Sequence, residues 1–208
     1  MSKASIVNAI TFARVPLILA WLGFAVAGEL MPGVLAWPVA ACAMMLFSGL
    51  TDLYDGRLAR RWHCVSTLGK MADPLMDKVF YLVAFPALVW EIAYQGESRA
   101  HALAMLAFTI LYLLRDTWVT FMRSIGTMYH ADVSAMWLGK VRTALSFPGA
   151  GWVYFYLAFH RCAPESWQTP WLWACYAVEA SLAALTLVSL FTYTAAYLPY
   201  LKKSLEHN

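Results

Sequence analysis

The chain has 208 residues, of which 62% are hydrophobic and 13% are charged, and its formal net charge is +3. Soluble domains average about 25% charged residues, so this composition excludes an ordinary soluble enzyme and indicates an all-α, polytopic membrane protein. Apolar runs recur from end to end, which predicts one transmembrane domain over residues 1–208 and no nucleic-acid partner.

Six apolar segments are each near the roughly 20 residues that a bilayer core requires. In chain order they cover about 6–27, 34–61, 69–90, 100–128, 136–159 and 171–200. The second segment continues past residue 50 and carries a charged stretch out at one surface. Pro74 either begins the third helix, where its missing N–H costs least, or kinks a helix that begins earlier.

Lysine and arginine are strongly biased toward one side of these six spans, which sets the predicted orientation. Both termini share a side because the number of spans is even. Thirteen of the fifteen lysine and arginine residues fall on that side, and only Arg99 and Arg161 fall on the other. The sequence therefore predicts cytoplasmic N and C termini, with the stretch after residue 50 facing the cytoplasm.

The first apolar segment carries polar residues at three-residue steps, namely Asn8, Thr11 and Arg14. They interrupt the clean apolar core of a cleaved signal peptide, so we interpret residues 6–27 as a retained membrane helix. Residues three apart share one helix face. There they either line a cavity or form hydrogen bonds between helices, and both roles stay open.

Four aspartates form two closely spaced pairs between residues 52 and 77. Asp52 and Asp55 are three residues apart and Asp73 and Asp77 are four apart, so on helices each pair projects from one face. Carboxylates at a membrane boundary are costly and usually have a partner. Oxygen ligands suit Mg²⁺ or Mn²⁺, and two divalent ions would cancel four negative charges.

The sequence therefore predicts a two-metal site at the cytoplasmic membrane surface. The alternative is a solvated loop with scattered charges, which does not explain this phasing on otherwise apolar helical segments.

Gly56 and Ala59 follow on the same helix, and Arg60 comes next. Small residues there serve either helix packing or the approach of a ligand to the backbone. Because Asp55 and Arg60 bracket them, we favour a ligand cleft.

A second charged cluster lies in and after the fourth apolar segment. Its members are Arg115, Asp116, Arg123, Lys140 and Arg142. Ionisable residues in such a segment usually mark function, and arginine forks match phosphate oxygens. We predict that the basic residues, with Arg14, bind the phosphate of an anionic co-substrate. The alternative is a structural Arg115–Asp116 pair, which is weakened because adjacent helical residues point about 100° apart.

The cysteines and one glutamate have no predicted chemistry. Cys42, Cys64, Cys162 and Cys175 show no C-x₂-C spacing, which predicts neither a disulfide framework nor a zinc site. Glu179 stands alone in the last apolar segment without a partner that the sequence identifies. We interpret the cysteines as small apolar side chains and Glu179 as a satisfied structural residue.

The aspartates belong to a longer pattern, Asp52-x₂-Asp55-Gly56-x₂-Ala59-Arg60-x₈-Gly69-x₃-Asp73-x₃-Asp77. It resembles the signature of the CDP-alcohol phosphotransferase (CDP-alcohol phosphatidyltransferase) family, with all eight fixed positions filled. Over most of its length the chain is similar to the phosphatidylglycerophosphate synthase branch. That similarity rests on Asn8/Thr11/Arg14, on Asp73-Pro74-x₂-Asp77-Lys78 and on residues 134–143. Where that branch carries Arg-Glu, this chain has Arg115-Asp116. The aspartate keeps the negative charge of the glutamate, but its shorter side chain places that charge closer to the backbone.

The resemblance implies transfer of the phosphatidyl group from CDP-diacylglycerol to glycerol 3-phosphate, with release of CMP and formation of phosphatidylglycerophosphate. It implies two Mg²⁺ or Mn²⁺ ions at the four aspartates, with Asp77 as general base. The residues implied for CDP-diacylglycerol are Asn8, Thr11, Asp52, Gly56, Ala59 and Arg60. A homodimer among membrane lipids is also implied, in the cytoplasmic (inner) membrane of a bacterium with the active site facing the cytoplasm.

Two other functions remain open. A cardiolipin synthase of the same family would accept phosphatidylglycerol in place of glycerol 3-phosphate, although a cationic pocket favours a phosphate-ester acceptor. A divalent-cation transporter would use the aspartates as a permeation site. The acids lie at one predicted surface and not at the midplane, which counts against transport.

Overall fold

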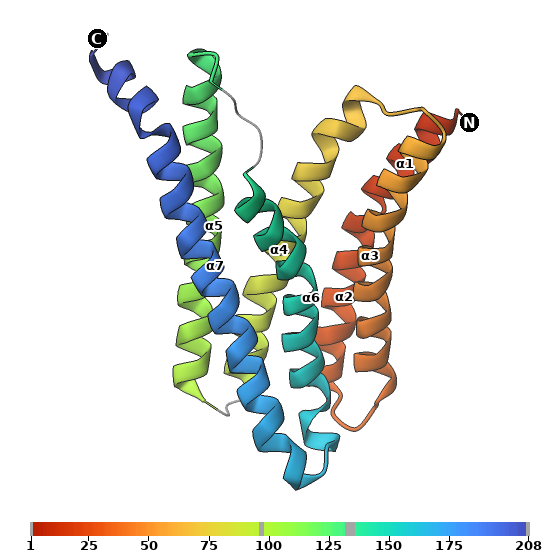
Figure 1. Ribbon diagram of the computed structural model, residues 1–208. Helices are drawn as coiled ribbons and strands as arrows, with labels where there is room; N and C mark the ends of the chain where they lie inside the picture. The colour runs from red at the N-terminus through yellow and green to blue at the C-terminus, as the bar shows by residue number, and fades with distance from the viewer. Residues whose placement is uncertain (1, 96–97, 132–135, 207–208) are drawn as a thin grey trace. The chain divides into compact units, whose positions relative to one another are not determined.

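The computed structural model describes residues 2–95, 98–131 and 136–206 (Figure 1). These described residues form helices and no strand, which confirms the predicted all-α class. The chain divides into two compact units, residues 1–97 and 98–208, and each unit is described by itself.

The N-terminal unit contains the first four helices. They are α1 (Lys3–Phe12), α2 (Arg14–Leu30), α3 (Ala36–Arg61) and α4 (Thr67–Gln95). Helix α2 packs against α3 and α4, and the short α1 contacts the same two helices. The interior of this unit is apolar, with Ile18, Trp21, Ala41 and Leu88 all buried. The charged ends of α3 and α4 are thereby held next to α1 and the start of α2.

The predicted first span is divided into two helices. Helix α1 ends at Phe12 and α2 begins at Arg14, with Ala13 between them. Pro16 explains the break, because its ring nitrogen cannot donate the helical hydrogen bond to the carbonyl of Phe12. Proline is tolerated in the first turn of the new helix for the same reason.

Helices α3 and α4 carry the two aspartate pairs. Helix α3 continues to Arg61, as predicted for the second segment. Helix α4 begins at Thr67, before the predicted start at residue 69, so Pro74 lies inside the helix and not in its first turn. A proline there removes one backbone hydrogen bond of the helix.

The C-terminal unit contains α5 (Arg99–Met128), α6 (Trp137–Phe159), the 3₁₀ helix η1 (His160–Cys162) and α7 (Glu165–Glu206). Helix α7 packs against both α5 and α6. Helices α5 and α7 run parallel, because residue numbers increase in the same direction along both at their contacts. His101 of α5 lies beside Glu179 of α7, and further along Trp118 lies beside Thr194.

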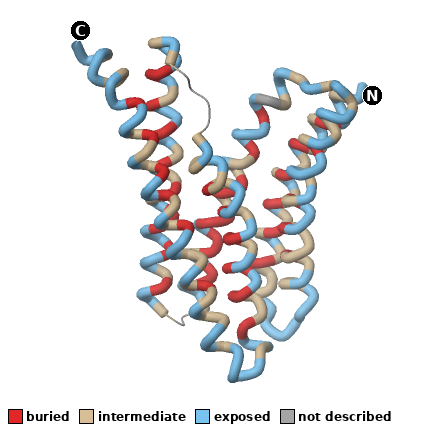
Figure 2. The backbone as a smooth tube through the Cα atoms, viewed as in Figure 1, coloured by how far each residue is buried: buried red, intermediate tan, exposed pale blue. Residues whose placement is uncertain are grey.

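Buried residues line the faces where helices meet within each unit, whereas much of the outer surface is exposed and apolar (Figure 2).

Four segments of the described chain are long and apolar enough to cross a membrane. They are Lys3–Leu30, Ala36–Arg61, Arg99–Met128 and Glu165–Glu206. The predicted third and fifth spans correspond to α4 and α6, which are not among these four. Six spans, cytoplasmic termini and a single domain therefore stay predictions.

Candidate active site

The four predicted aspartates converge on one buried arginine. Arg14 Nη2 lies 2.5 Å from Asp52 Oδ1 and 2.7 Å from Asp55 Oδ2, both on α3. On α4, Asp73 Oδ1 is 3.6 Å from Arg14 Nη2 and Asp77 Oδ1 is 3.2 Å from Nη1. The two pairs therefore face each other across a single guanidinium, which comes from the start of α2.

The four carboxylates differ in their exposure. Asp55 is 2% exposed and accepts hydrogen bonds from Arg14 and from Thr11 Oγ1, the latter at 2.8 Å. The side chains of Asp52, Asp73 and Asp77 are 53%, 52% and 41% exposed. Asp55 is thus anchored by α1 and α2, whereas the other three carboxylates remain open to a ligand.

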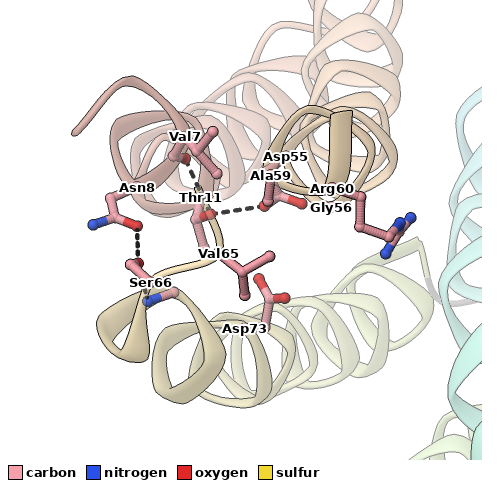
Figure 3. A pocket seen from close by; sticks show the side chains of 11 residues that line it. Val7, Asn8, Thr11, Asp55, Gly56, Ala59, Arg60, Val65, Ser66 and Asp73 are labelled. Carbon is pink, nitrogen blue, oxygen red and sulfur yellow. Dashed lines mark hydrogen bonds between the residues drawn. The ribbon is translucent and has the colours of Figure 1, made fainter. Parts of the chain in front are cut away.

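A cavity of about 210 Å³ adjoins this cluster within the N-terminal unit (Figure 3). It is lined by Val7, Asn8, Thr11, Asp55, Gly56, Ala59, Arg60, Val65, Ser66, Gly69 and Asp73. The lining includes five of the six residues predicted to bind CDP-diacylglycerol. The sixth, Asp52, contacts Arg14 instead. Thr11 and Asp55 point toward one another, and Asp73 faces them from α4 (Figure 3).

One wall of the cavity depends on Gly69. Ser66 Oγ donates to Asn8 Oδ1 at 2.9 Å and accepts from the Gly69 N–H at 2.9 Å. A Cβ atom on Gly69 would lie 3.1 Å from Ser66 Oγ and 3.3 Å from Asn8 Oδ1, which is tight. Ser66 is not among the predicted site residues, although a serine directly before a helix is a recognisable N-cap signal.

Gly56 lies beside the side chain of Arg60, one turn further along α3. The heavy atoms closest to an added Cβ there belong to Arg60 on the same helix, with Nη1 at 3.5 Å. Close packing between helices, which was the alternative interpretation of Gly56 and Ala59, would bring a second helix near that position. Gly56, Ala59 and Arg60 all line the cavity, and a ligand cleft there stays a prediction.

The residues at the cluster fit a divalent metal ion. Four carboxylates face one guanidinium, so these five side chains together have a formal charge of −3. All the donors are oxygens, three of the carboxylates are accessible, and such donor sets suit Mg²⁺ or Mn²⁺.

The second predicted cluster forms a buried network in the C-terminal unit. Arg115 Nη1 lies 3.0 Å and Arg142 Nη2 lies 2.5 Å from Asp116 Oδ1, and Arg115 Nη2 donates to Ser189 Oγ. Arg115 and Asp116 therefore form the structural pair that was the alternative interpretation, although adjacent helical residues point about 100° apart. The long arginine side chain bends back far enough to reach the neighbouring carboxylate.

The arginines of this network also stack on aromatic rings. Arg142 lies over the Tyr112 ring at 4.0 Å and Arg115 over the Tyr193 ring at 5.0 Å. Among the described residues, Arg142 Nη1 and Nε and Arg115 Nε are buried and donate no hydrogen bond to the protein. Unpaired buried donors are costly, so they indicate a missing acceptor.

The remaining residues predicted to bind the acceptor phosphate lie elsewhere. Arg123 is half-buried further along α5, and Lys140 is exposed near the start of α6. Arg14 belongs to the N-terminal unit, where the aspartates engage it. In the related segment 134–143, residues 134 and 135 lie outside the described residues.

Comparison with known proteins identifies the family. The sequence model of the CDP-alcohol phosphatidyltransferase family matches residues 4–187. A protein of Escherichia coli K12, named CDP-diacylglycerol–glycerol-3-phosphate 3-phosphatidyltransferase, is 30% identical over 162 residues, which cover 76% of this chain and 79% of that protein. A Salmonella choleraesuis SC-B67 protein of the same name is 30% identical over 165 residues, covering 77% and 80% of the two chains.

The matched region contains both the aspartate cluster and most of the cationic network. The chain therefore belongs to the CDP-alcohol phosphatidyltransferase family and is a membrane enzyme of phosphatidyl transfer.

Proposed function

We propose that this protein transfers the phosphatidyl group of CDP-diacylglycerol to glycerol 3-phosphate, forming phosphatidylglycerophosphate and CMP. The observation that carries the proposal is the convergence of four carboxylates on Arg14 beside a cavity lined by the family motif. The names of the Escherichia coli and Salmonella relatives support this choice of donor and acceptor.

We assign two Mg²⁺ or Mn²⁺ ions to Asp52, Asp55, Asp73 and Asp77. Ions at such a site stabilise negative charge on the entering and leaving oxygens of the transferred phosphoryl group. The protein's own contribution is to hold the carboxylates in place. Thr11 and Arg14 fix Asp55 by hydrogen bonds, while the more exposed aspartates face the substrate side.

The nucleotide end of CDP-diacylglycerol occupies the cavity in this proposal. Gly56 and Ala59 leave the α3 backbone open to a flat group, while Asn8 and Thr11 offer polar contacts from α1. Arg60, whose guanidinium extends beside Gly56, supplies positive charge for the pyrophosphate. The acyl chains remain in the bilayer, with which the apolar outer surface is compatible.

Asp77 acts as the general base. Its side chain is 41% exposed, which makes the carboxylate accessible to an acceptor whose hydroxyl proton it can take. The resulting oxygen attacks the phosphorus next to the diacylglycerol. The bond from that phosphorus to the bridging oxygen breaks, and CMP leaves with the bonding electrons.

We assign the phosphate of glycerol 3-phosphate to the cationic residues Arg115, Arg123, Lys140 and Arg142. The unpaired buried donors on Arg115 and Arg142 support an anionic ligand there. Arg14 was predicted for the same role, but its contacts with the aspartates favour a structural and electrostatic role at the metal site.

The proposal also includes the topology. We propose six spans in one domain, with the termini and the aspartate cluster on the cytoplasmic side of a bacterial inner membrane, and a homodimer. The distribution of lysine and arginine supports this orientation.

The test is to incubate the purified full-length protein with CDP-diacylglycerol, Mg²⁺ and one candidate alcohol at a time, and to identify the lipid product by mass spectrometry. Phosphatidylglycerophosphate from glycerol 3-phosphate is the expected product. Cardiolipin formed from phosphatidylglycerol would instead identify a cardiolipin synthase. Metal flux through proteoliposomes that survives Asp77→Asn, without any lipid product, would favour a transporter.

A further inference from the structure

A cluster of metal-binding side chains lies in the C-terminal unit, away from the cationic network. His101 on α5 and Cys175 and Glu179 on α7 place one ligand atom each within 4.8 Å of one another. Fourteen residues of α5 separate His101 from Arg115, which corresponds to about 21 Å along the helix. We propose that these three residues bind a single transition-metal ion of the Zn²⁺ type.

The geometry of the cluster is close to that of a metal site. His101 Nε2 lies 2.9 Å from Glu179 Oε1, and Cys175 Sγ lies 3.5 Å from the same oxygen. In a tetrahedral zinc site, nitrogen, sulfur and oxygen ligands are about 3.4–3.6 Å apart, as follows from the metal–ligand bond lengths. The sulfur–oxygen distance already matches, and the nitrogen must withdraw from the oxygen by roughly half an ångström. The nitrogen and the sulfur lie within 4.8 Å of each other and must come to about 3.6 Å.

The positions on the helices favour chelation. Cys175 and Glu179 are four residues apart on α7, so their side chains share a face. His101 approaches that face from α5, and its ring packs edge-on against Tyr176 with the centroids 4.8 Å apart. His101 and Cys175 are buried and Glu179 is nearly so, which means that the ligands are held by packing before any ion binds.

The ligand types select a different metal from the aspartate site. One imidazole, one thiolate and one carboxylate suit Zn²⁺, whereas Mg²⁺ prefers oxygen ligands. Three protein ligands leave a fourth position for water or another group. The proposed ion is therefore separate from the metals assigned to phosphatidyl transfer.

The charges of the cluster are compatible with the ion. The cluster lies in helices apolar enough to span a membrane, where an uncompensated charge is costly. A divalent ion with one thiolate, one carboxylate and a neutral imidazole has no net charge. The competing arrangement is a protonated His101 paired with Glu179, with Cys175 as a thiol donor, and this arrangement also has no net charge. Only an experiment separates the two.

The experiment uses the full-length protein, stripped with a chelator and titrated with Co²⁺. The aspartates can also bind Co²⁺, so the diagnostic signal is the near-ultraviolet thiolate-to-cobalt charge-transfer band, which requires a cysteine ligand. We expect this band to saturate at one equivalent and to disappear when Zn²⁺ displaces Co²⁺. Zinc measured by mass spectrometry after stripping and reloading then gives the stoichiometry.

Variants assign the ligands. Cys175→Ser should abolish the band, while Cys162→Ser, which changes an exposed cysteine of the same unit, should leave it unchanged. Glu179→Gln keeps the shape of the side chain and should weaken Co²⁺ binding by more than the roughly 10–100-fold typical of losing an outer-shell partner. An unchanged gel-filtration profile establishes that each variant is folded.

Absence of a thiolate band, or a band that persists in Cys175→Ser, would overturn the proposal and leave a hydrogen-bonded His–Glu–Cys cluster. Should Cys175→Ser fail to fold, Glu179→Gln decides between the two arrangements. The proposal does not depend on the proposed reaction, because metal binding here is measured without substrate.

Discussion

Arg14 shows how one residue organises the candidate active site. Its guanidinium lies within 4 Å of carboxylate oxygens from Asp52, Asp55, Asp73 and Asp77, so it compensates one of four negative charges. Asp55 is the carboxylate most dependent on this contact because it is buried. Asp52, Asp73 and Asp77 are exposed, so ions or substrate can replace their contacts with Arg14. In our proposal the buried Asp55 therefore holds the cluster together, and the three exposed aspartates take part in the reaction.

Asp77→Asn is the sharpest test at the residue scale. Asparagine keeps the shape of the side chain but cannot accept the proton of the acceptor hydroxyl, so turnover should fall at least about 10²–10⁴-fold. The measurement is CMP release at saturating substrates. Glu165→Gln, at an exposed acid at the start of α7, is the matched control and should retain normal turnover. Near-normal activity of Asp77→Asn would refute its assignment as the base.

Gly69→Ala tests the wall of the cavity. The added methyl group would crowd Ser66 Oγ and Asn8 Oδ1, so those side chains must move by a few tenths of an ångström. We expect the KM for CDP-diacylglycerol to rise, by less than the about 10²-fold cost of a 1 Å misplacement. Steady-state kinetics provide the measurement. Gly23→Ala, where an added Cβ meets nothing within 4 Å, should leave KM unchanged.

At the scale of helices, the contact between α5 and α7 organises the C-terminal unit. In the C-terminal unit, α5 and α7 approach closely where Gly126 faces Tyr197. Val119, Met122 and Tyr193 complete a buried apolar cluster at this crossing. The cationic network lies in the same region, with Arg115 stacked on Tyr193. Close packing of α5 on α7 thus positions Arg115.

Gly126→Ala should therefore destabilise the α5–α7 contact. A Cβ atom at residue 126 would lie 2.7 Å from Tyr197 Cε1, and overpacking of this kind costs about 1–3 kcal/mol. We expect a lower Tm in thermal unfolding of the detergent-solubilised protein. A Tm equal to that of the wild-type protein would show that the Tyr197 ring moves aside freely.

At the scale of the whole molecule, the proposed function predicts a dependence on bound divalent ions and one orientation in the membrane. EDTA should abolish CMP release, because the carboxylates alone do not stabilise the charge of the transferred group. Addition of Mg²⁺ or Mn²⁺ should restore it. Activity that persists through complete chelation would exclude a role for the aspartate site in metal binding.

Two native cysteines can test the proposed orientation. Cys162 is exposed between α6 and α7, on the proposed periplasmic side, and Cys64 follows α3 on the proposed cytoplasmic side. In intact cells, a membrane-impermeant maleimide should label a variant that retains only Cys162. It should label a variant that retains only Cys64 after permeabilisation and not before. The reverse pattern would invert the topology.

The sequence by itself determined the all-α class of the fold and the pairing of the aspartates on one face of each helix. Helical period explains this success, because spacings of three and four residues dictate which side chains share a face. The division of the first span at Ala13 was not predicted from the sequence, although Pro16 explains it. Element boundaries differed by a few residues, since capping and packing decide where a helix begins and ends.

Only the tertiary structure decided which faces meet. Arg14 bonds to Asp55 across 41 residues, Arg142 to Asp116 across 26, and His101 to Glu179 across 78. Local periodicity gives the direction of a side chain on its own helix but not the helix that packs opposite it. For this reason the sequence left Glu179 without a partner and placed Arg14 with the acceptor phosphate. Helix packing within each unit brought these residues to their actual neighbours.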